Sequence, residues 1–231
     1  MKTRNGLFLF FASSFCLLGI SAQANDGWVE LFDGKTLDGW KVESGTATYR
    51  VEEGMIIGRT VEGSRNTFLC KGPYADFELE LDVWCDSPLN SGIQIRSQIQ
   101  QENTTPVPGE RKRTPGTLYG YQCEIAAADS HVSGNFWDEA RRVKWLDDFS
   151  DRPQAQAAFK NDTWNHYRIV AQGDHLRSWV NGVPCADFHD STDASGLIGL
   201  QVHAIKAGTG PYQVRWKNIW IRELKPGEQV K

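Results

Sequence analysis

The sequence predicts an all-β protein, a jelly-roll sandwich of two antiparallel sheets, and three observations predict this fold. About a dozen short segments alternate between apolar and polar residues with the period of two that a half-buried strand shows. Turn residues separate these segments at short intervals, and the 231-residue chain contains 22 glycines. Helical periodicity is scarce, and no strand–helix–strand spacing of the kind that parallel sheets need is present. Hairpin-connected strands packed as two sheets account for all three observations.

The chain opens with the pattern of an export signal. Two basic residues precede an apolar run from Leu7 to Ile20, and Ala22-Gln23-Ala24 has the small-x-small form of a cleavage site. The apolar run is too short to span a bilayer stably, so a retained membrane anchor is the weaker alternative. We expect residues 1–24 to be removed on export. Residues 25–231 then form one β-sandwich domain in the periplasm or outside the cell, without membrane insertion.

The net charge limits the classes of possible partner, and the cysteines limit the possible disulfides and metal sites. The formal net charge is −4, and no basic run is present, so neither nucleic acid nor an anionic membrane surface is expected as a partner. Export permits disulfides, but four cysteines allow three pairings, and buried free thiols are an equally good alternative. No pair of cysteines has a metal-binding spacing. The four cysteines that follow the export signal are Cys70, Cys85, Cys123 and Cys185.

The first part of the domain is expected to hold five short strands. A compact hairpin is predicted at Glu52-Glu53-Gly54, because glycine supplies the positive φ that such a turn needs. In the last of the five strands, acids at positions 78, 80 and 82 alternate with apolar residues. This acidic stripe is typical of a solvated outer face, with a metal site as the rarer alternative. The expected strands are Trp28–Phe32, Thr46–Val51, Met55–Gly58, Asn66–Lys71 and Phe77–Trp84.

Two irregular regions interrupt the strand pattern in the middle of the chain. Residues 100–115 read as a long loop, and loops of this length in compact domains are often functional. Residues 129–149 form a second irregular region, and residues 153–159 are expected to form one or two helical turns. Regular strands then resume, with a hairpin at Asn181-Gly182 and a local irregularity at Lys217-Asn218. The expected strands are Trp164–Gln172, His175–Val180, Pro184–Phe188, Gly196–His203 and Tyr212–Leu224.

Three strands each carry an adjacent pair of polar residues on one face and small or apolar residues on the other. If the three strands are neighbours in one sheet, these pairs form a single polar floor that holds an arginine, a glutamate and a histidine. Such a concentration of titratable groups marks the place where chemistry is expected. The pairs are Gln94 with Arg96, Gln122 with Glu124, and Gln201 with His203.

Several segments together resemble one family, the 3-keto-disaccharide hydrolases. They keep their order along the chain and span nearly all of it. The resemblance implies a concanavalin-like sandwich, an exported bacterial protein and activity on glycosides oxidised at C3. The matching segments are residues 30–40, residues 90–96, residues 120–125, Trp164-Asn165 with residues 179–182, and residues 199–203 with residues 217–219.

A 3-keto glycoside suggests roles for the polar floor. The hydrogen at C2 is acidified by the ketone, so a base, a positive group or metal for the enolate oxygen, and an acid for the leaving oxygen are needed. We expect His203 to be the base, because imidazole titrates closest to neutral pH. Arg96 suits the enolate or a sugar hydroxyl, and Glu124 suits the acid. Amides that bind hydroxyls and aromatic rings that stack on a sugar complete the site. The substrate-binding candidates are Asn90, Gln94, Tyr121, Gln122, Trp137, Glu139, Arg142, Trp179 and Gln201.

The sequence leaves alternatives open at these residues. Glu124 and His203 could hold a divalent metal ion, although their spacing is not diagnostic of one. Arg96 and Glu124 could form a salt bridge that only braces the sheet. An ordinary glycosidase needs two carboxylates, so it would require Asp138 or Glu139 to join Glu124. The alternative function is a non-catalytic carbohydrate-binding module on the same sandwich. In either case the expected partner is a small carbohydrate.

Overall fold

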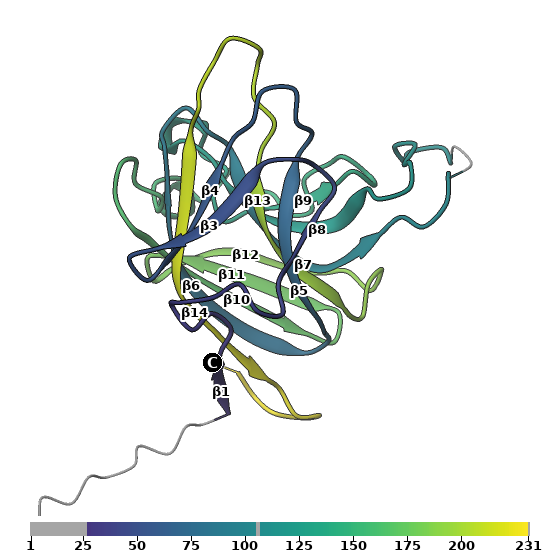
Figure 1. Cartoon of the computed structure of the whole chain (residues 1–231). Helices are drawn as coiled ribbons and strands as arrows, with labels where there is room; N and C mark the ends of the chain where they lie inside the picture. The colour runs from purple at the N-terminus through teal and green to yellow at the C-terminus, as the bar shows by residue number, and fades with distance from the viewer. Residues whose placement is uncertain (1–26, 105–106, 231) are drawn as a thin grey trace, which may run out of the picture.

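The computed structural model describes residues 27–104 and 107–230, and these residues form a sandwich of two antiparallel sheets (Figure 1). The predicted all-β class is therefore confirmed. Regular helix is limited to the single turn of α1 (Pro153–Gln156) and a 3₁₀ turn at Ala128–Ser130 within the described ranges. The predicted export signal lies outside the described residues. None of the described helices is long and apolar enough to cross a membrane.

One sheet has eight strands in the order β12-β11-β10-β6-β14-β4-β3, and β1 pairs with β14 at one end. The order mixes strands from both ends of the chain, as long jelly-roll connections require. Its strands are β1 (Trp28–Glu30), β3 (Thr48–Glu52), β4 (Met55–Arg59), β6 (Phe77–Cys85), β10 (Asn165–Gln172), β11 (His175–Val180), β12 (Val183–His189) and β14 (Gln213–Glu223).

The other sheet has six strands in the order β2-β5-β13-β7-β8-β9. The three strands that carry the polar pairs are β13, β7 and β8, which are consecutive in this order, so the prediction that they are neighbours is confirmed. The strands are β2 (Lys41–Glu43), β5 (Thr67–Tyr74), β7 (Ser91–Ile99), β8 (Leu118–Ile125), β9 (Phe136–Glu139) and β13 (Gly196–Val202).

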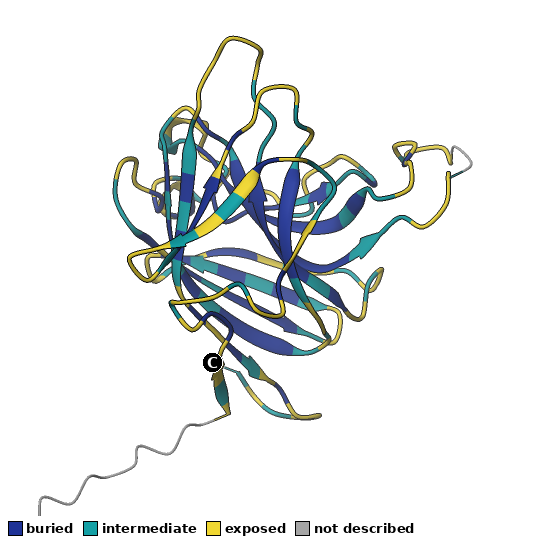
Figure 2. Cartoon of the chain, viewed as in Figure 1, coloured by how far each residue is buried: buried dark blue, intermediate teal, exposed yellow. Residues whose placement is uncertain are grey.

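Apolar side chains of both sheets meet between them and form the main core. Ile93 and Leu200 of the six-stranded sheet and Leu79 and Trp216 of the eight-stranded sheet are fully buried members of this cluster. Figure 2 shows the buried residues concentrated along the strands and the exposed residues along the connecting loops. Because side chains alternate along a strand, the polar residues between these apolar positions lie on the outer face of each sheet.

Most local predictions agree with the structure. Asn181 and Gly182 have φ angles of 51° and 78°, the positive values expected for their turn. Asn218 has a φ of 51°, and the pairing of β14 with β6 shifts register there, which confirms the predicted irregularity. Strands β2 and β9, both short, were not predicted from the sequence. Strand β9 lies inside the region that was interpreted as irregular.

The packing decides two predictions: whether the acids of β6 are solvated, and whether the cysteines are free. The acids of β6 lie on the outer face as expected, but Glu78 is buried between Arg168 and Arg222, with ion pairs of 2.5 and 2.6 Å. The expectation of a solvated stripe is therefore wrong for Glu78. The four described cysteines are all buried and free, so the free-thiol alternative is the one observed.

Candidate active site

A chain of amide groups crosses the outer face of the six-stranded sheet and ends at Glu124. Gln94 and Gln201 each donate through Nε2 to Oε1 of Gln122, at 2.7 and 2.8 Å. Gln122 in turn donates through Nε2 to Oε2 of Glu124 at 2.9 Å, and Asn90 donates to the other oxygen. The register pairs Gln94 directly with Gln122, so neighbouring strands hold these side chains side by side. Both oxygens of the buried carboxyl therefore accept a hydrogen bond.

Two glycines make room for this chain of amides. A Cβ atom at position 92 would lie 2.5 Å from Cδ of Gln122, and one at position 199 would lie 3.2 Å from Cβ of Gln94. The first distance is a severe clash, and the second is tight. Gly92 is thus required because the Gln122 side chain occupies the space above it, which explains the glycine in the Asn90-Ser91-Gly92 segment.

The environment of Glu124 favours its protonated form. Burial raises its pKa to about 7, the hydrogen bonds from Asn90 and Gln122 oppose this rise, and the nearby Glu139 carboxyl adds to it. Desolvation outweighs the two hydrogen bonds because an ionised carboxylate loses far more solvation than a neutral one. Near neutral pH this group therefore holds its proton about half of the time.

Strand β9 adds a second carboxylate on the same face. Trp137 pairs with Gln122 and Glu139 pairs with Gly120, so both side chains share the face of the amide chain. Asn66, just before β5, donates to Oε1 of Glu139 at 3.1 Å. Burial raises the pKa of Glu139, while the Asn66 hydrogen bond and the charge of His203 oppose the rise. Two buried carboxyl groups with raised pKa values thus lie near one histidine.

His203 follows the end of β13 and has one ring nitrogen fixed. Its Nδ1 lies 2.6 Å from the carbonyl oxygen of Ala204. A carbonyl oxygen only accepts hydrogen bonds, so Nδ1 must carry the hydrogen. In the neutral imidazole, the lone pair is then on Nε2, and that nitrogen is the one able to take a proton.

These side chains surround a cavity of about 330 Å³. The volume falls in the usual range for small-molecule sites. One wall is formed by Trp137 and Trp145, whose ring centroids are 5.0 Å apart and whose backbones form an isolated β-bridge. Aromatic faces suit the C–H faces of sugars, and amides suit their hydroxyls. The lining residues are Asn90, Gln122, Glu124, Trp137, Glu139, Trp145 and His203.

Comparison with known protein families identifies the family to which the domain belongs. A family described as the 3-keto-alpha-glucoside-1,2-lyase-like domain matches residues 27–222. The chain belongs to this family. The resemblance to the 3-keto-disaccharide hydrolases is thereby confirmed, and the match covers both sheets and every residue that lines the cavity. Among curated proteins, none matches this sequence.

Solved structures similar to this lyase-like domain share its sandwich fold. A protein of Parabacteroides distasonis that is provisionally named a glycosyl hydrolase is 19% identical, with a TM-score of 0.56 over 87% of this chain and 95% of that one. Carbohydrate-binding module CBM66 from Bacillus subtilis is 17% identical, with a TM-score of 0.54 over 80% and 96%. A lichenase from a mouse hindgut metagenome is 11% identical, with a TM-score of 0.52 over 85% and 97%. At these identities the likeness shows the fold alone.

The structure brings six of the predicted site residues of this lyase-like domain to the cavity and two more directly behind it. Gln94 and Gln201 are fully buried and act through Gln122 rather than facing the cavity. Asn66, which donates a hydrogen bond to Glu139, was not predicted, because no pattern in the sequence connects the start of β5 with β9. The six residues that line the cavity are Asn90, Gln122, Glu124, Trp137, Glu139 and His203.

Arg96 does not share the polar floor, and its predicted place there is corrected. A register shift follows Ile95, and Arg96 has a φ of 47°, so a bulge turns its side chain away from the face of Gln94. The fully buried guanidinium donates to the carbonyl oxygens of Ala75 and Gly173, at 2.7 and 2.6 Å, and pairs with Asp76 at 2.8 Å. It ties loops together and does not reach Glu124, so the predicted salt bridge with Glu124 is also absent.

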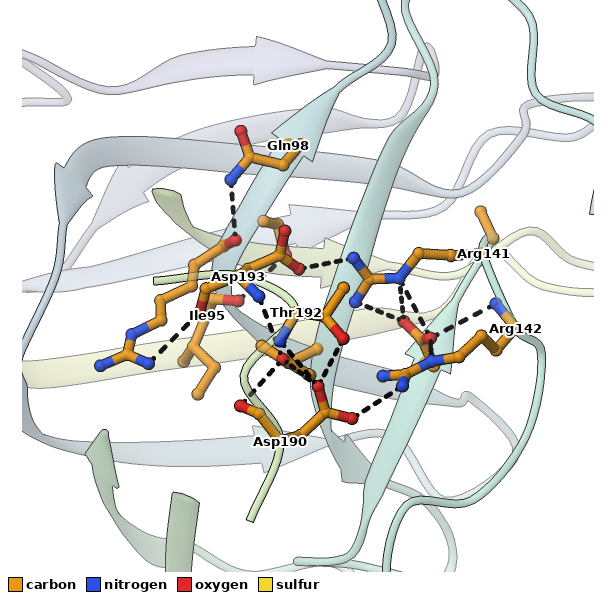
Figure 3. A network of polar contacts seen from close by, with 12 residues as sticks. Ile95, Gln98, Arg141, Arg142, Asp190, Thr192 and Asp193 are labelled. Carbon is orange, nitrogen blue, oxygen red and sulfur yellow. Dashed lines mark hydrogen bonds and ion pairs between the residues drawn. The ribbon is translucent and has the colours of Figure 1, made fainter. Parts of the chain in front are cut away.

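Tyr121 and Arg142 also lie outside the cavity. Tyr121 points into the core and donates to Asp190 at 2.6 Å. Arg142 pairs with Asp190 at 2.7 Å (Figure 3). It also pairs with Asp138, which lies on the opposite face of β9 from Glu139. Both side chains are instead bound to Asp190, within a network of polar and charged groups. Their predicted contact with substrate is therefore corrected.

Trp179 belongs to the other sheet. It lies on β11, where Arg168 and Arg177 stack against its ring at 4.5 and 5.5 Å. Val180 and Leu176 point into the core, so alternation directs Trp179 to the outer face of the eight-stranded sheet. The prediction that Trp179 contacts the sugar is corrected for this reason.

We expect Arg96→Ala to reduce stability and to leave turnover by the folded protein unchanged. Loss of the guanidinium leaves buried carbonyl oxygens without donors, which costs about 3 kcal/mol. Urea unfolding measures the first effect, and kcat under native conditions measures the second. Arg50→Ala is the control, because that exposed arginine pairs only with Glu52 and its loss costs less than about 1 kcal/mol. A large fall in kcat without a change in the unfolding midpoint would show that Arg96 acts in the site.

The residues of the cavity do not form a recognisable metal centre. Within the described ranges, no group of three or more histidine, cysteine, aspartate or glutamate side chains is arranged to hold a metal ion. Glu124 and His203 line the same cavity, but each is already held by protein partners at one or more of its polar atoms. The steps proposed below therefore use only the side chains of this chain.

Proposed function

We propose that this protein is an exported carbohydrate-active enzyme that cleaves 3-keto glycosides by elimination followed by hydration. One observation carries the proposal. Glu124, a buried carboxyl with a pKa of about 7, faces the same cavity as His203, a histidine whose tautomer is fixed. An acid and a base that both work near neutral pH are what this reaction needs. Family membership supports a 3-keto glycoside as the substrate class.

The reaction proceeds through an enolate. A base removes the hydrogen at C2, and the electron pair of that C–H bond moves toward the C3 ketone oxygen. The enolate then collapses, a C1–C2 double bond forms, and the bond from C1 to the aglycone oxygen breaks as that oxygen receives a proton. Water adds to C1 of the resulting enone and C2 is reprotonated, which gives the free 3-keto sugar and completes a net hydrolysis.

Each step has a residue suited to it. Nε2 of His203 takes the C2 proton, and Glu139 in its ionised form, which the charge of His203 favours, stabilises the imidazolium that forms. Glu124 in its protonated form supplies the proton to the leaving oxygen. A carboxamide has two N–H donors, and Asn90 uses one on Glu124, so its second N–H serves the enolate oxygen at C3.

Direct displacement by two carboxylates fits the site less well. Glu139 does join Glu124 at the cavity, so the pair that an ordinary glycosidase needs is present. That mechanism requires one protonated carboxyl and one ionised carboxylate of clearly lower pKa. Burial raises the pKa of both groups, and the match to a lyase-like family favours an elimination over this displacement. An elimination with a histidine base avoids the need for a readily ionised carboxylate.

A non-catalytic carbohydrate-binding module is the second candidate. The pair of Trp137 and Trp145 at the wall of the cavity favours it, because such a pair alone is enough to hold a sugar ring. A binding module has no use for a buried carboxyl beside a histidine, since burial of a titratable group costs stability. The two candidates are separated by turnover.

The deciding experiment is incubation of the protein with a 3-keto glucoside in heavy water. We expect release of the aglycone and deuterium at C2 of the product, because C2 loses its proton and regains one from solvent. His203→Ala should lower kcat by about a hundredfold, since general base catalysis contributes at least that much. Nuclear magnetic resonance of the product reports the C2 label, and chromatography reports the aglycone.

Three controls complete the design. The free 3-keto sugar without protein gives the background exchange at C2, and an unoxidised disaccharide should remain intact. His175→Ala is the matched variant, because His175 lies on the other sheet and should leave kcat unchanged. Full turnover by His203→Ala contradicts the assignment of the base. Tight binding of the keto glycoside without release of aglycone establishes the binding module instead.

A further inference from the structure

A second cavity of about 450 Å³ adjoins the first one. Glu139 and His203 line both cavities, so a ligand that fills the first can continue into the second. Part of its lining comes from residues 111–114, which belong to the long segment predicted from its length to be functional. None of the steps proposed above uses this second space. The side chains that line it therefore indicate which chemical group is attached to the reacting sugar.

The lining of the second cavity is strongly cationic. It includes Arg65, Arg111, Lys112 and Arg113, against the single acidic side chain of Glu139. The chain as a whole has a net charge of −4, so this concentration of positive charge is local. A cleft lined by one sign of charge focuses its field and attracts ligands of the opposite sign.

One of the four cations is neutralised by the protein. Arg113 is buried, pairs with Glu110 at 3.0 Å and stacks on Tyr119 at 4.4 Å. The three others form no ion pair with any acidic side chain in the described part of the chain. Arg65 donates only to the backbone oxygen of Ser44, at 2.5 Å. Three cations without an ion pair thus remain at the cavity: Arg65, Arg111 and Lys112. The charge of one of them, Arg111, acts on Glu139 from a longer distance.

The cationic wall is held in place by hydrogen bonds. The backbone N–H of Arg111 donates to the carbonyl oxygen of Arg141 at 2.7 Å, and that of Arg113 donates to the Thr104 hydroxyl at 2.9 Å. On the other side, the Ser44 hydroxyl donates to Gly116 at 2.8 Å. These bonds fix the backbone that carries Arg111 and Arg113, so a ligand need not order this part of the loop when it binds.

We infer that the second cavity receives an anionic substituent of the aglycone, a carboxylate in the simplest case. The inference rests on the proposed function, because it takes the sugar ring to occupy the first cavity. The aglycone leaves from C1, and the shared residues Glu139 and His203 place that end of the sugar at the boundary between the cavities. Arginine and lysine donors then meet the anion, and such charge-assisted hydrogen bonds are stronger than those to neutral groups.

The test compares two 3-keto glucosides that differ only in charge. One carries a 3-carboxypropyl aglycone and the other a 3-carbamoylpropyl aglycone, which have similar shapes. We expect kcat/KM to favour the carboxylate by about tenfold. The double variant Arg111→Gln with Lys112→Gln should reduce that ratio to about two. Raising the ionic strength from about 0.05 M to about 0.5 M should reduce it as well.

The control is the double variant Lys35→Gln with Lys160→Gln, which removes the same charge outside both cavities and should keep the tenfold ratio. An equal kcat/KM for both substrates, or a preference that survives loss of Arg111 and Lys112, overturns the inference and leaves the proposed function intact. If neither glycoside is cleaved, the proposed function fails. In that case, calorimetry measures the affinity of the protein for the two glucosides that lack the C3 ketone. An affinity about tenfold higher for the carboxylate supports the anion preference, and equal affinities overturn it.

Discussion

Glu124→Gln should lower kcat about a thousandfold for a 3-keto glucoside with an alkyl aglycone, because the variant has no proton to give to the leaving oxygen. Glutamine keeps the size of the side chain, and its Oε1 can still accept from Asn90. The wild-type pKa of about 7 also sets the pH profile. Since the acid must be protonated, wild-type kcat should fall as the pH rises through 7, and the variant should lack this alkaline limb. Steady-state kinetics from about pH 5 to about pH 9 measures both effects.

The leaving group provides the sharpest check on this role. A nitrophenolate departs without protonation, so the loss in Glu124→Gln should shrink to about tenfold with that aglycone. Equal losses for alkyl and nitrophenyl aglycones would falsify the acid role and point to general damage to the site. Glu30→Gln is the matched control, because Glu30 is exposed on β1 and its loss should change neither rate.

Unfolding measurements test the pKa of Glu124 independently of activity. Its pKa in the folded state, about 7, exceeds its ordinary value of 4.5, so the folded state binds the proton more tightly. The stability that this group contributes is complete below about pH 4.5 and is lost as the pH rises to about 7. The loss amounts to about 3 kcal/mol. Relative to the wild type, Glu124→Gln should gain about this much between pH 5 and pH 8.

The polar floor could be predicted from the sequence because it depends only on the period of two. Gln94, Gln122, Glu124 and Gln201 each alternate with apolar neighbours inside a strand, and the hydrophobic effect fixes which face of each strand turns inward. Once the three strands are neighbours, their polar sides must meet. The order β13-β7-β8 satisfies this condition. The family resemblance and the period of two therefore predicted the same residues for the part of the site that lies on regular strands.

Arg96 could not be placed in this way, because a bulge breaks the period. The alternation holds from Ile93 to Ile95, and one extra residue then turns Arg96 off the floor. Ser97 takes the place beside Gln94, and its hydroxyl donates to Oε1 of Gln94 at 2.5 Å. Bulges depend on contacts that are distant in the sequence. Here Gly196 lies so close that a Cβ atom on it would be 2.4 Å from the backbone of Arg96. No local pattern signals such an approach.

Residues contributed by irregular segments were the hardest to assign. The alternation of β9 covers only four residues, too few to show which of Trp137, Asp138 and Glu139 share a face. Their orientation is fixed instead by a buried ion network on the core side of the strand. Arg141 contacts Asp138 at 3.0 Å. It also contacts Asp193 (Figure 3), at 2.7 Å. Asp193 is more than fifty positions away in the sequence, so the pairing is a product of the fold.

This network makes Asp138 a position where a single substitution should strongly destabilise the protein. Asp138 is fully buried and pairs with both Arg141 and Arg142. Asp138→Ala leaves two guanidinium groups with fewer acidic partners in a low-dielectric environment, and removal of one member of a buried ion pair costs about 4 kcal/mol. For a domain of this size, Tm should fall by roughly 10 °C. Differential scanning calorimetry measures the shift.

The same substitution tests whether the network positions the site. Asp138 lies between Trp137 and Glu139 on β9, so loss of its ion pairs releases the strand that carries both of them. We expect KM to rise and kcat to fall even at temperatures where the variant is fully folded, because small displacements of positioned groups are costly for catalysis. Asp187→Ala is the control, since that exposed aspartate pairs only with His175 and should shift Tm by less than about 2 °C. Unchanged kinetics in folded Asp138→Ala would assign the network to stability alone, and Glu139 would then owe its position to Asn66.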